Sequence, residues 1–172
     1  MLEAAILIIF PFAMAHAATS DMLTMTIANR VSIILIASFA LLAPLTGMDW
    51  SVYGMHFLAM AIVLAICFCL FAIGVMGGGD AKLMASTSLW IGLNIHLIEY
   101  LVIGSFIGGI LTLMILRFRG SSMAVYGGQV EFLRKMAEPK GKIPYGIALG
   151  LAGLFVFPET TMAQWVIERM AT

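Results

Sequence analysis

Charged residues are scarce in this sequence, and their scarcity excludes an ordinary soluble protein. Only 10% of the 172 residues are charged, whereas 62% are hydrophobic. Several apolar runs reach the roughly 20 residues that a helix needs to cross about 30 Å of hydrocarbon. The chain is therefore expected to be all-α, a polytopic membrane bundle of about six transmembrane helices.

The length leaves room for these helices and short connections, but for no separate soluble domain. We expect one integral membrane domain over residues 1–172. The stretch 83–116 is too long for a single crossing, because its residues would extend about 51 Å as one helix. The polar residues Asn94, His96 and Glu99 are therefore predicted to mark a turn. The expected spans are 4–19, 31–46, 56–76, 80–95, 97–116 and 143–157.

Cysteine is nearly absent, and the sequence offers no clear metal site. Cys67 and Cys69 are two residues apart in a predicted helix, so they point to different faces and neither pair nor share a metal. His96 and Glu99 are three apart but lack further ligands, so we expect a hydrogen bond between them instead. No metal and no cofactor are expected.

Positive charge is concentrated on one side of the predicted bundle. Arg30, Lys82 and six Lys or Arg residues between 117 and 142 fall on that side, which leaves only Arg169 on the other. Cationic loops are typical of the cytoplasmic side. Both termini are therefore expected outside, with Asp21 and Asp80 at the cytoplasmic face.

An aspartate follows three glycines at the end of a long apolar run. Gly77, Gly78, Gly79 and Asp80 come directly after about twenty uncharged residues, 57–76. An ionised carboxylate is costly at bilayer depth, so this acid is a functional-site hypothesis. The glycines let the backbone bend and let another chain approach closely.

Two aspartates on separate helices at one membrane face indicate aspartic peptidase chemistry. When two carboxyl groups share a proton, one acts as general base while the other stays protonated as general acid. Water held between Asp21 and Asp80 can then attack a peptide carbonyl. The alternative is structural: Asp21 caps or solvates a loop, and Asp80 caps the helix that follows it.

The sequence resembles the type IV prepilin peptidases, which are aspartic peptidases of the GxGD type. Their first motif is an aspartate, five residues and then Ile-Pro-Asn; here Asp21 is followed by residues 22–26 and then Ile27, Ala28 and Asn29. Ala28 stands where the family usually has proline. This departure weakens the turn but removes no chemical group.

The second family motif, Gly-x-Gly-Asp, is met by residues 77–80, and Lys82 belongs to its usual continuation. The resemblance implies that Asp21 and Asp80 are catalytic and that Gly77, Gly78, Gly79, Ile27, Asn29 and Lys82 support them. The sequence around Pro144, at the start of the last span, is also similar to the family. Larger members carry a zinc-binding domain with two CxxC pairs, which this sequence lacks.

The resemblance therefore implies a short, peptidase-only form like those of Flp-type tight-adherence pili. Such an enzyme removes the short basic leader from prepilins or pseudopilins at the cytoplasmic face of the bacterial inner membrane. Its expected partners are these substrates, membrane lipid and the pilus assembly machinery, with no nucleic acid.

Two other function classes remain open. A small transporter would place acids in a bundle, but it would also show inverted repeats and polar residues at mid-membrane. A non-catalytic assembly subunit of a pilus or secretion system would tolerate the loss of either aspartate.

Four further expectations concern single segments. Lys82 is expected to contact lipid phosphate, and Gly79 is expected to tolerate substitution less well than Gly92. Residues 129–137 have helical amphipathic spacing and are expected on the anionic inner leaflet. The tail 162–170 is expected to lie along the outer membrane surface.

Overall fold

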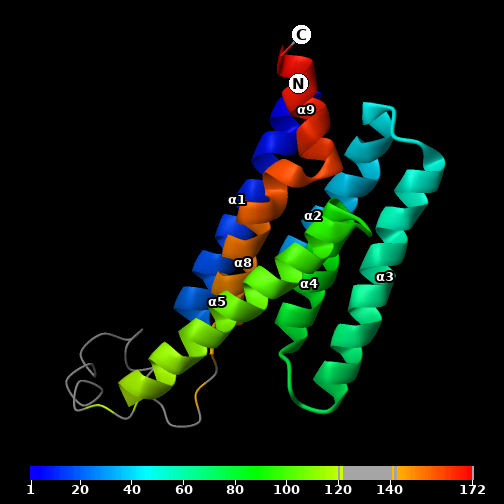
Figure 1. Ribbon diagram of the computed structural model, residues 1–172. Coiled ribbons are helices and arrows are strands. Elements are labelled where there is room, and N and C mark those ends of the chain that lie inside the picture. The colour runs from blue at the N-terminus through cyan, green and yellow to red at the C-terminus, as the bar shows by residue number, and fades with distance from the viewer. Residues whose placement is uncertain (120, 122–140, 142, 172) are drawn as a thin grey trace.

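The computed structural model describes residues 1–119, 121, 141 and 143–171, and the regular elements in this part are all helices, with no strand. Figure 1 shows the helices side by side, with both termini at one end of the bundle. The predicted all-α bundle is confirmed. In chain order the elements are α1 (Leu2–Thr24), α2 (Asn29–Leu42), the 3-10 helix η1 (Ala43–Thr46), α3 (Trp50–Ala72), α4 (Gly78–Ile91), α5 (Ile95–Arg119), α8 (Tyr145–Val156), the 3-10 helix η3 (Phe157–Glu159) and α9 (Thr161–Ala171).

Within the part of the chain that the structure describes, four helices are long and apolar enough to cross a membrane: α1, α2 continued by η1, α3 and α5. The pair formed by α8 with η3 and by α9 is bent by 45° and makes a fifth candidate if it counts as one span. α4 has 14 residues and is about 21 Å long, too short for a full crossing. Length and composition thus support four or five of the six expected spans, and the chain is a multi-pass membrane protein.

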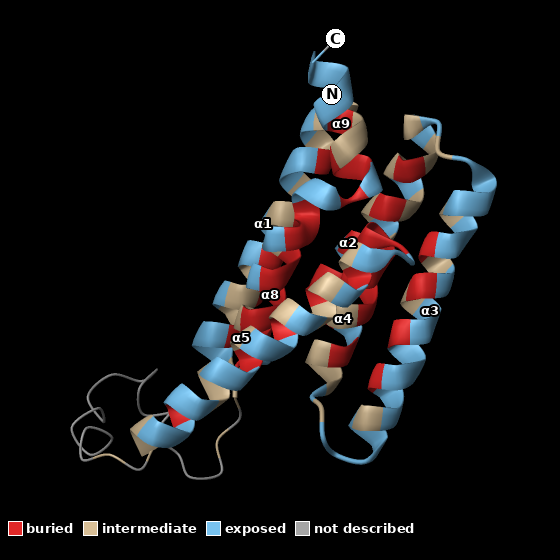
Figure 2. Ribbon diagram, in the orientation of Figure 1, coloured by how far each residue is buried: buried red, intermediate tan, exposed pale blue. Residues whose placement is uncertain are grey.

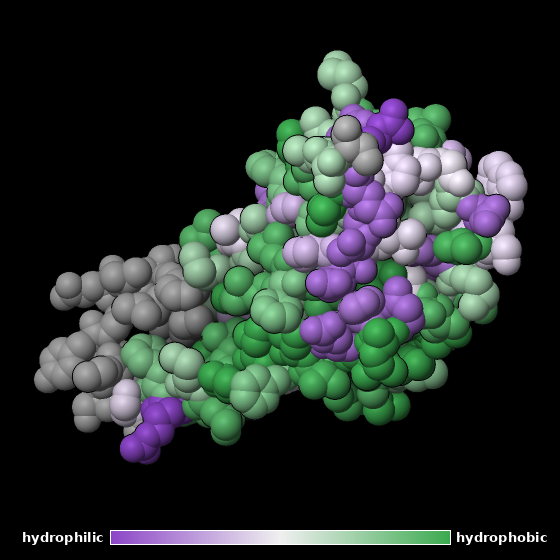
Figure 3. All heavy atoms as spheres, turned by 45° about the horizontal axis from the view of Figure 1, so that its top comes forward, coloured by the Kyte–Doolittle hydropathy of each residue, from purple (hydrophilic) through white to green (hydrophobic). Residues whose placement is uncertain are grey.

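The surface of the bundle fits this conclusion. Large apolar side chains are exposed along α3 and α5, where Phe68, Phe106 and Leu113 are each more than 60% accessible. Figure 3 shows a largely hydrophobic surface, with hydrophilic residues gathered toward the end that carries the termini. Lipid tails are the environment that such a surface requires.

α4 lies in the interior of the bundle, packed against α2, α3 and α8. Nine of its residues are buried, and Figure 2 shows this burial along the helix. Its interior position explains how a polar run can occur there: Ser86 and Ser88 donate to the carbonyls of Leu83 and Ala85 on the same helix. Polar side chains in membrane helices belong on faces turned toward protein. The sequence of α4 is therefore less apolar than that of the lipid-facing helices.

The predicted turn between the fourth and fifth helices is confirmed, a few residues earlier than expected. α4 ends at Gly92, which has a φ of +84°, and Asn94 accepts the backbone N–H groups of His96 and Leu97 at the start of α5. The imidazole of His56 lies against Gly92, where an added Cβ would come within 2.8 Å of the ring. Gly92 is therefore crowded by His56, and the expectation that Gly79 tolerates substitution less well than Gly92 stays a prediction.

α8 packs between α1 and α5, and small residues bring the three helices close together. A Cβ at Gly150 would lie 2.8 Å from the backbone oxygen of Met14 in α1. On the other side, Gly108 of α5 accommodates the ring of Tyr145, and Gly104 faces Leu149. Close approach at small residues is a common way for membrane helices to associate. This packing holds the start of α8 beside the end of α1.

α9 packs onto the bundle through one face. Its residues Met162 and Val166 are fully buried, and the helix contacts α1, α4 and η1. Near the chain ends, Nε of Arg169 pairs with Oε1 of Glu3 at 3.2 Å. The expected position of residues 162–170 along the outer membrane surface stays a prediction. The amphipathic segment expected at 129–137 lies outside the described residues.

Candidate active site

Asp21 lies near the end of α1 and is only 4% exposed. The helix ends because Met25 adopts the left-handed conformation, with a φ of 55°, and its N–H bonds the carbonyl of Asp21. The chain then turns into α2, whose N-cap is Ala28 at φ −69° and ψ 133°. A proline ring fixes φ close to this value. Alanine therefore adopts the backbone conformation that the family's proline would impose.

Asp80 lies in the first turn of α4, and its carboxylate folds back toward the N-cap, Gly77. A Cβ on Gly77 would lie 2.6 Å from Oδ2 of Asp80, a distance that real atoms do not tolerate. A Cβ on Gly78 would lie 3.3 Å from the ring of Phe71. The glycines thus make room for the aspartate and for the preceding helix.

The two sequence motifs are in direct contact. A Cβ on Gly79 would lie 3.3 Å from Cβ of Ile27 and 3.6 Å from its backbone N and O atoms. A short distance away, Nζ of Lys82 donates a hydrogen bond to Oδ1 of Asn29 at 3.0 Å. The first turn of α4 is therefore tied to the connection between α1 and α2. The lipid contact expected of Lys82 stays a prediction.

Asp21 also receives a hydrogen bond from a helix far away in the sequence. The backbone N–H of Gly146, in the first turn of α8, donates to Oδ2 of Asp21 at 2.6 Å in a buried position. Sequence reasoning did not give Gly146 a role at the site. The sequence feature that could have drawn attention to Gly146 is Pro-Tyr-Gly at residues 144–146, where the last predicted span begins.

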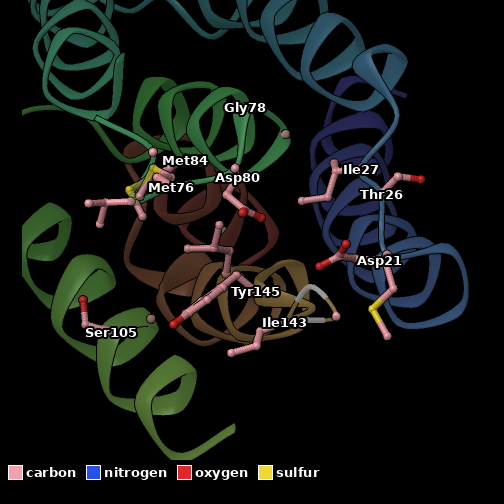
Figure 4. Close-up of a pocket in the computed structure, with 18 residues that line it drawn as sticks. Asp21, Thr26, Ile27, Met76, Gly78, Asp80, Met84, Ser105, Ile143 and Tyr145 are labelled. Carbon is pink, nitrogen blue, oxygen red and sulfur yellow. The ribbon is translucent and has the colours of Figure 1, made fainter. Parts of the chain in front are cut away.

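Both aspartates line one cavity of about 730 Å³. Figure 4 shows their carboxyl groups pointing into the space between α1 and α4, with Tyr145 on the adjacent wall. The hydroxyl of Tyr145 lies 2.9 Å from Oγ1 of Thr112 on α5. A cavity of this volume is large enough for a substantial ligand. Its lining comprises Asp21, Met25, Thr26, Ile27, Gly74, Val75, Met76, Gly77, Gly78, Gly79, Asp80, Met84, Gly104, Ser105, Gly141, Ile143, Tyr145 and Leu149.

The other polar residues singled out from the sequence lie away from this cavity. Nδ1 of His96 is 3.2 Å from Oε2 of Glu99, which confirms the expected hydrogen bond. Cys67 is buried and Cys69 exposed, so the two thiols do lie on different faces of α3. Among the described residues, no three His, Cys, Asp or Glu side chains form a group able to hold a metal ion.

The sequence model of the type IV leader peptidase family matches residues 8–113, which are 106 of the 172 residues. The chain belongs to this family, and the resemblance inferred from the two motifs is thereby confirmed. The matched segment includes both aspartates and ends before α8. No curated protein and no solved structure matches the chain.

Proposed function

We propose that this family member is an aspartic endopeptidase in which Asp21 and Asp80 form the catalytic dyad. Its substrates are type IV prepilins of the Flp kind or pseudopilins, from which it removes the short basic leader. Residues 1–172 act as one integral membrane peptidase domain. The observation that carries the proposal is that two carboxyl groups from different helices point into the same cavity.

Two carboxyl groups at one cavity can share the acid and base steps of peptide hydrolysis. Oδ2 of Asp21 accepts the N–H of Gly146, which fixes the orientation of this carboxyl group. One aspartate takes a proton from the water as it attacks the peptide carbonyl, and the other protonates the leaving nitrogen. The bond between carbon and nitrogen breaks, giving a carboxylic acid and an amine.

The lining of the cavity fits a substrate that is partly embedded in the membrane. Methionine and aliphatic side chains, including Met76, Met84 and Leu149, make up much of its wall. Cleavage at the junction of a basic leader and an apolar segment requires a polar dyad beside an apolar groove. The aspartates satisfy the first requirement, and these side chains satisfy the second.

The proposed orientation places the dyad at the cytoplasmic face of the bacterial inner membrane. The end of α1 and the starts of α4 and α8, which line the cavity, lie at the end of the bundle opposite the termini (Figure 1). Arg30 and Lys82 lie close to the two motifs in sequence. Cationic residues favour the cytoplasmic side. In this orientation both termini lie outside, and a prepilin with its leader in the cytoplasm brings its cleavage site to the dyad. Membrane lipid and the pilus assembly machinery are the other proposed partners.

The decisive experiment compares Asp21→Asn and Asp80→Asn with Asp49→Asn, an exposed aspartate outside the cavity. Each variant is co-expressed with a prepilin of the Flp kind, and leader removal is followed by gel mobility. Both dyad variants should reach the membrane but lose cleavage, because a single carboxyl group cannot serve as both acid and base. Asp49→Asn should cleave normally.

Retained cleavage in either dyad variant would contradict the assignment. If another peptidase in the cell made the product, the retained cleavage would instead favour a non-catalytic assembly subunit or a transporter. A host strain without its own prepilin peptidases removes that ambiguity. Processing in such a strain then depends on this chain alone.

A further inference from the structure

The start of α8 reaches the aspartate of the first motif, although it lies beyond the segment that matches the family. Gly146 and Asp21 are 125 residues apart, and the hydrogen bond between them is buried. We infer that Gly146 is a positioning residue of the peptidase site, acting on Asp21 through its N–H and through its lack of a side chain. The inference rests on the proposed function, in which Asp21 is catalytic.

The space around Gly146 admits no side chain without displacing Asp21. An added Cβ would lie 2.8 Å from both Cβ and Oδ2 of Asp21 and 2.9 Å from Cδ1 of Ile27. By contrast, Gly54 and Gly109 have nothing within 4 Å of the same position. Cβ of Asp21 is fixed to a helix backbone and cannot swing away. A side chain at position 146 must therefore move α1 or α8, and the carboxyl group of Asp21 is displaced with them.

The N–H of Gly146 is available because of its place in the helix. Gly146 is the second residue of α8, and first-turn N–H groups have no acceptor within their own helix. The N-cap residue, Pro144, makes no side-chain capping bond. A helix N-terminus also favours a carboxylate electrostatically. The first turn of α8 thus supplies a donor with a fixed direction at the point where Asp21 lies.

The first turn of α8 is itself held from the opposite side by α5. Thr112 donates its hydroxyl proton to the carbonyl of Gly108 at 2.7 Å, so the proton between Thr112 and Tyr145 belongs to Tyr145. The Tyr145 ring rests on Gly108 and lines the cavity. Neighbouring residues of one helical turn therefore anchor α8 to α5 and orient Asp21 of α1.

The first test compares Gly146→Ala with Gly150→Ala in purified enzyme and a synthetic prepilin peptide. Gly150 lies one turn further along the same helix face and is equally crowded by α1, at 2.8 Å from the oxygen of Met14. Gly146→Ala should lower kcat by about 100-fold or more, because a displacement of about 1 Å at a catalytic group has effects of that size. KM should change far less than kcat.

Gly150→Ala should reduce the yield of folded protein, while its kcat per folded molecule stays within about threefold of wild type. Equal losses of kcat per folded molecule in the two variants would overturn the inference, because crowding between α1 and α8 would then explain both. A loss confined to position 146 supports it.

A second comparison separates the two atoms that a side chain at position 146 would meet. Ile27→Val removes the Cδ1 atom of Ile27 but leaves Asp21 in place. Gly146→Ala should be as damaging in the Ile27→Val background as in wild type, within about threefold. Recovery of kcat in the double variant would overturn the inference, since the contact with Ile27 would then be the cause.

The role of the N–H is tested without any added side chain. Replacing Gly146 by glycolic acid puts an ester in place of the amide and deletes the donor. Loss of a hydrogen bond to a charged group should lower kcat by roughly 10- to 100-fold. The pH profile of kcat should also be displaced, because the donor acts on a titrating carboxyl group. An unchanged kcat and pH profile would overturn the role of the N–H, even if Gly146→Ala does not fold.

Wild type and Asp21→Asn are measured in the same assay, so that a failure of the proposed function can be distinguished from a failure of the inference about Gly146. A wild-type protein without cleavage refutes the proposed function and the inference with it. A wild-type protein that cleaves, together with an undiminished Gly146→Ala, refutes the inference alone.

Discussion

The two ends of the bundle use the same packing arrangement for different purposes. At one end Asp21 lies against Gly146, and at the other His56 lies against Gly92, with each buried polar side chain filling the space that a glycine leaves. His56 donates from Nδ1 to the carbonyl of Leu89 at 2.7 Å and stacks on Phe39, and it does not line the main cavity. Asp21 does line it. A glycine beside a buried polar group thus indicates function only where a cavity accompanies it.

The comparison predicts that glycines at the cavity end control activity, and that Gly92 controls stability. Among the substitutions considered in this comparison, Gly77→Ala carries the largest expected effect on cleavage. Its Cβ would lie 2.6 Å from Oδ2 of Asp80, so the carboxylate must rotate out of place. We expect kcat to fall by about 100-fold with little change in melting temperature in detergent, because a rotating side chain relieves the clash. Activity near wild type would show that Asp80 works in another orientation.

Gly92→Ala should give the opposite result. The residue has a φ of +84°, and the added Cβ would lie 2.8 to 3.1 Å from three atoms of the His56 ring. Backbone strain and overpacking together should cost about 2–4 kcal/mol of unfolding free energy. The remaining folded enzyme should cleave at the wild-type rate. Thermal unfolding measured beside cleavage per folded molecule checks both parts, and a large loss of specific activity would mean that the two ends are coupled.

Lys82→Met tests how tightly the two motifs must be held together. It removes the hydrogen bond to Asn29 and keeps much of the side-chain length. Because this bond is exposed, we expect a loss of about 1 kcal/mol or less, or roughly fivefold in kcat/KM. Lys82→Gln keeps a donor and serves as the matched control. Equal activity in both variants at wild-type level would leave Lys82 with the lipid contact expected from the sequence.

Much of this arrangement could be predicted from the sequence, because it depends on local signals. Apolar runs predicted the helices, and the paired motifs predicted the family and two aspartates that line one cavity. The shortness of α4 was missed, because hydropathy does not distinguish a buried helix from a full span; its polar residues Ser86 and Ser88 were the available sign.

Contacts between distant segments could not be predicted in the same way. The hydrogen bond from Gly146 to Asp21 joins positions 125 residues apart and depends on how α8 packs between α1 and α5. The intolerance of Gly92 depends on a histidine 36 positions earlier in the sequence, on α3. Neither glycine has a sequence neighbour that indicates its partner. Such pairs appear only when the packing of whole helices is known.

The smallest expected effect concerns Ala28, where the chain departs from its family. Ala28 has a φ of −69° and a ψ of 133°, which proline adopts without strain, and it is the N-cap of α2. Ala28→Pro should therefore stabilise the protein by about 0.4–1 kcal/mol, since it restricts the unfolded chain more than the folded one. The substitution does not alter either carboxyl group of the proposed dyad, so cleavage should be unchanged. The measurement is the melting temperature in detergent, with Ala37→Pro, in the interior of α2, as the destabilising control.

A lower melting temperature for Ala28→Pro would mean that the N–H of Ala28 is needed, or that Ile27 before it requires a geometry that proline forbids. The connection between α1 and α2 would then differ from that of relatives with proline, in the segment that holds Ile27 against Gly79.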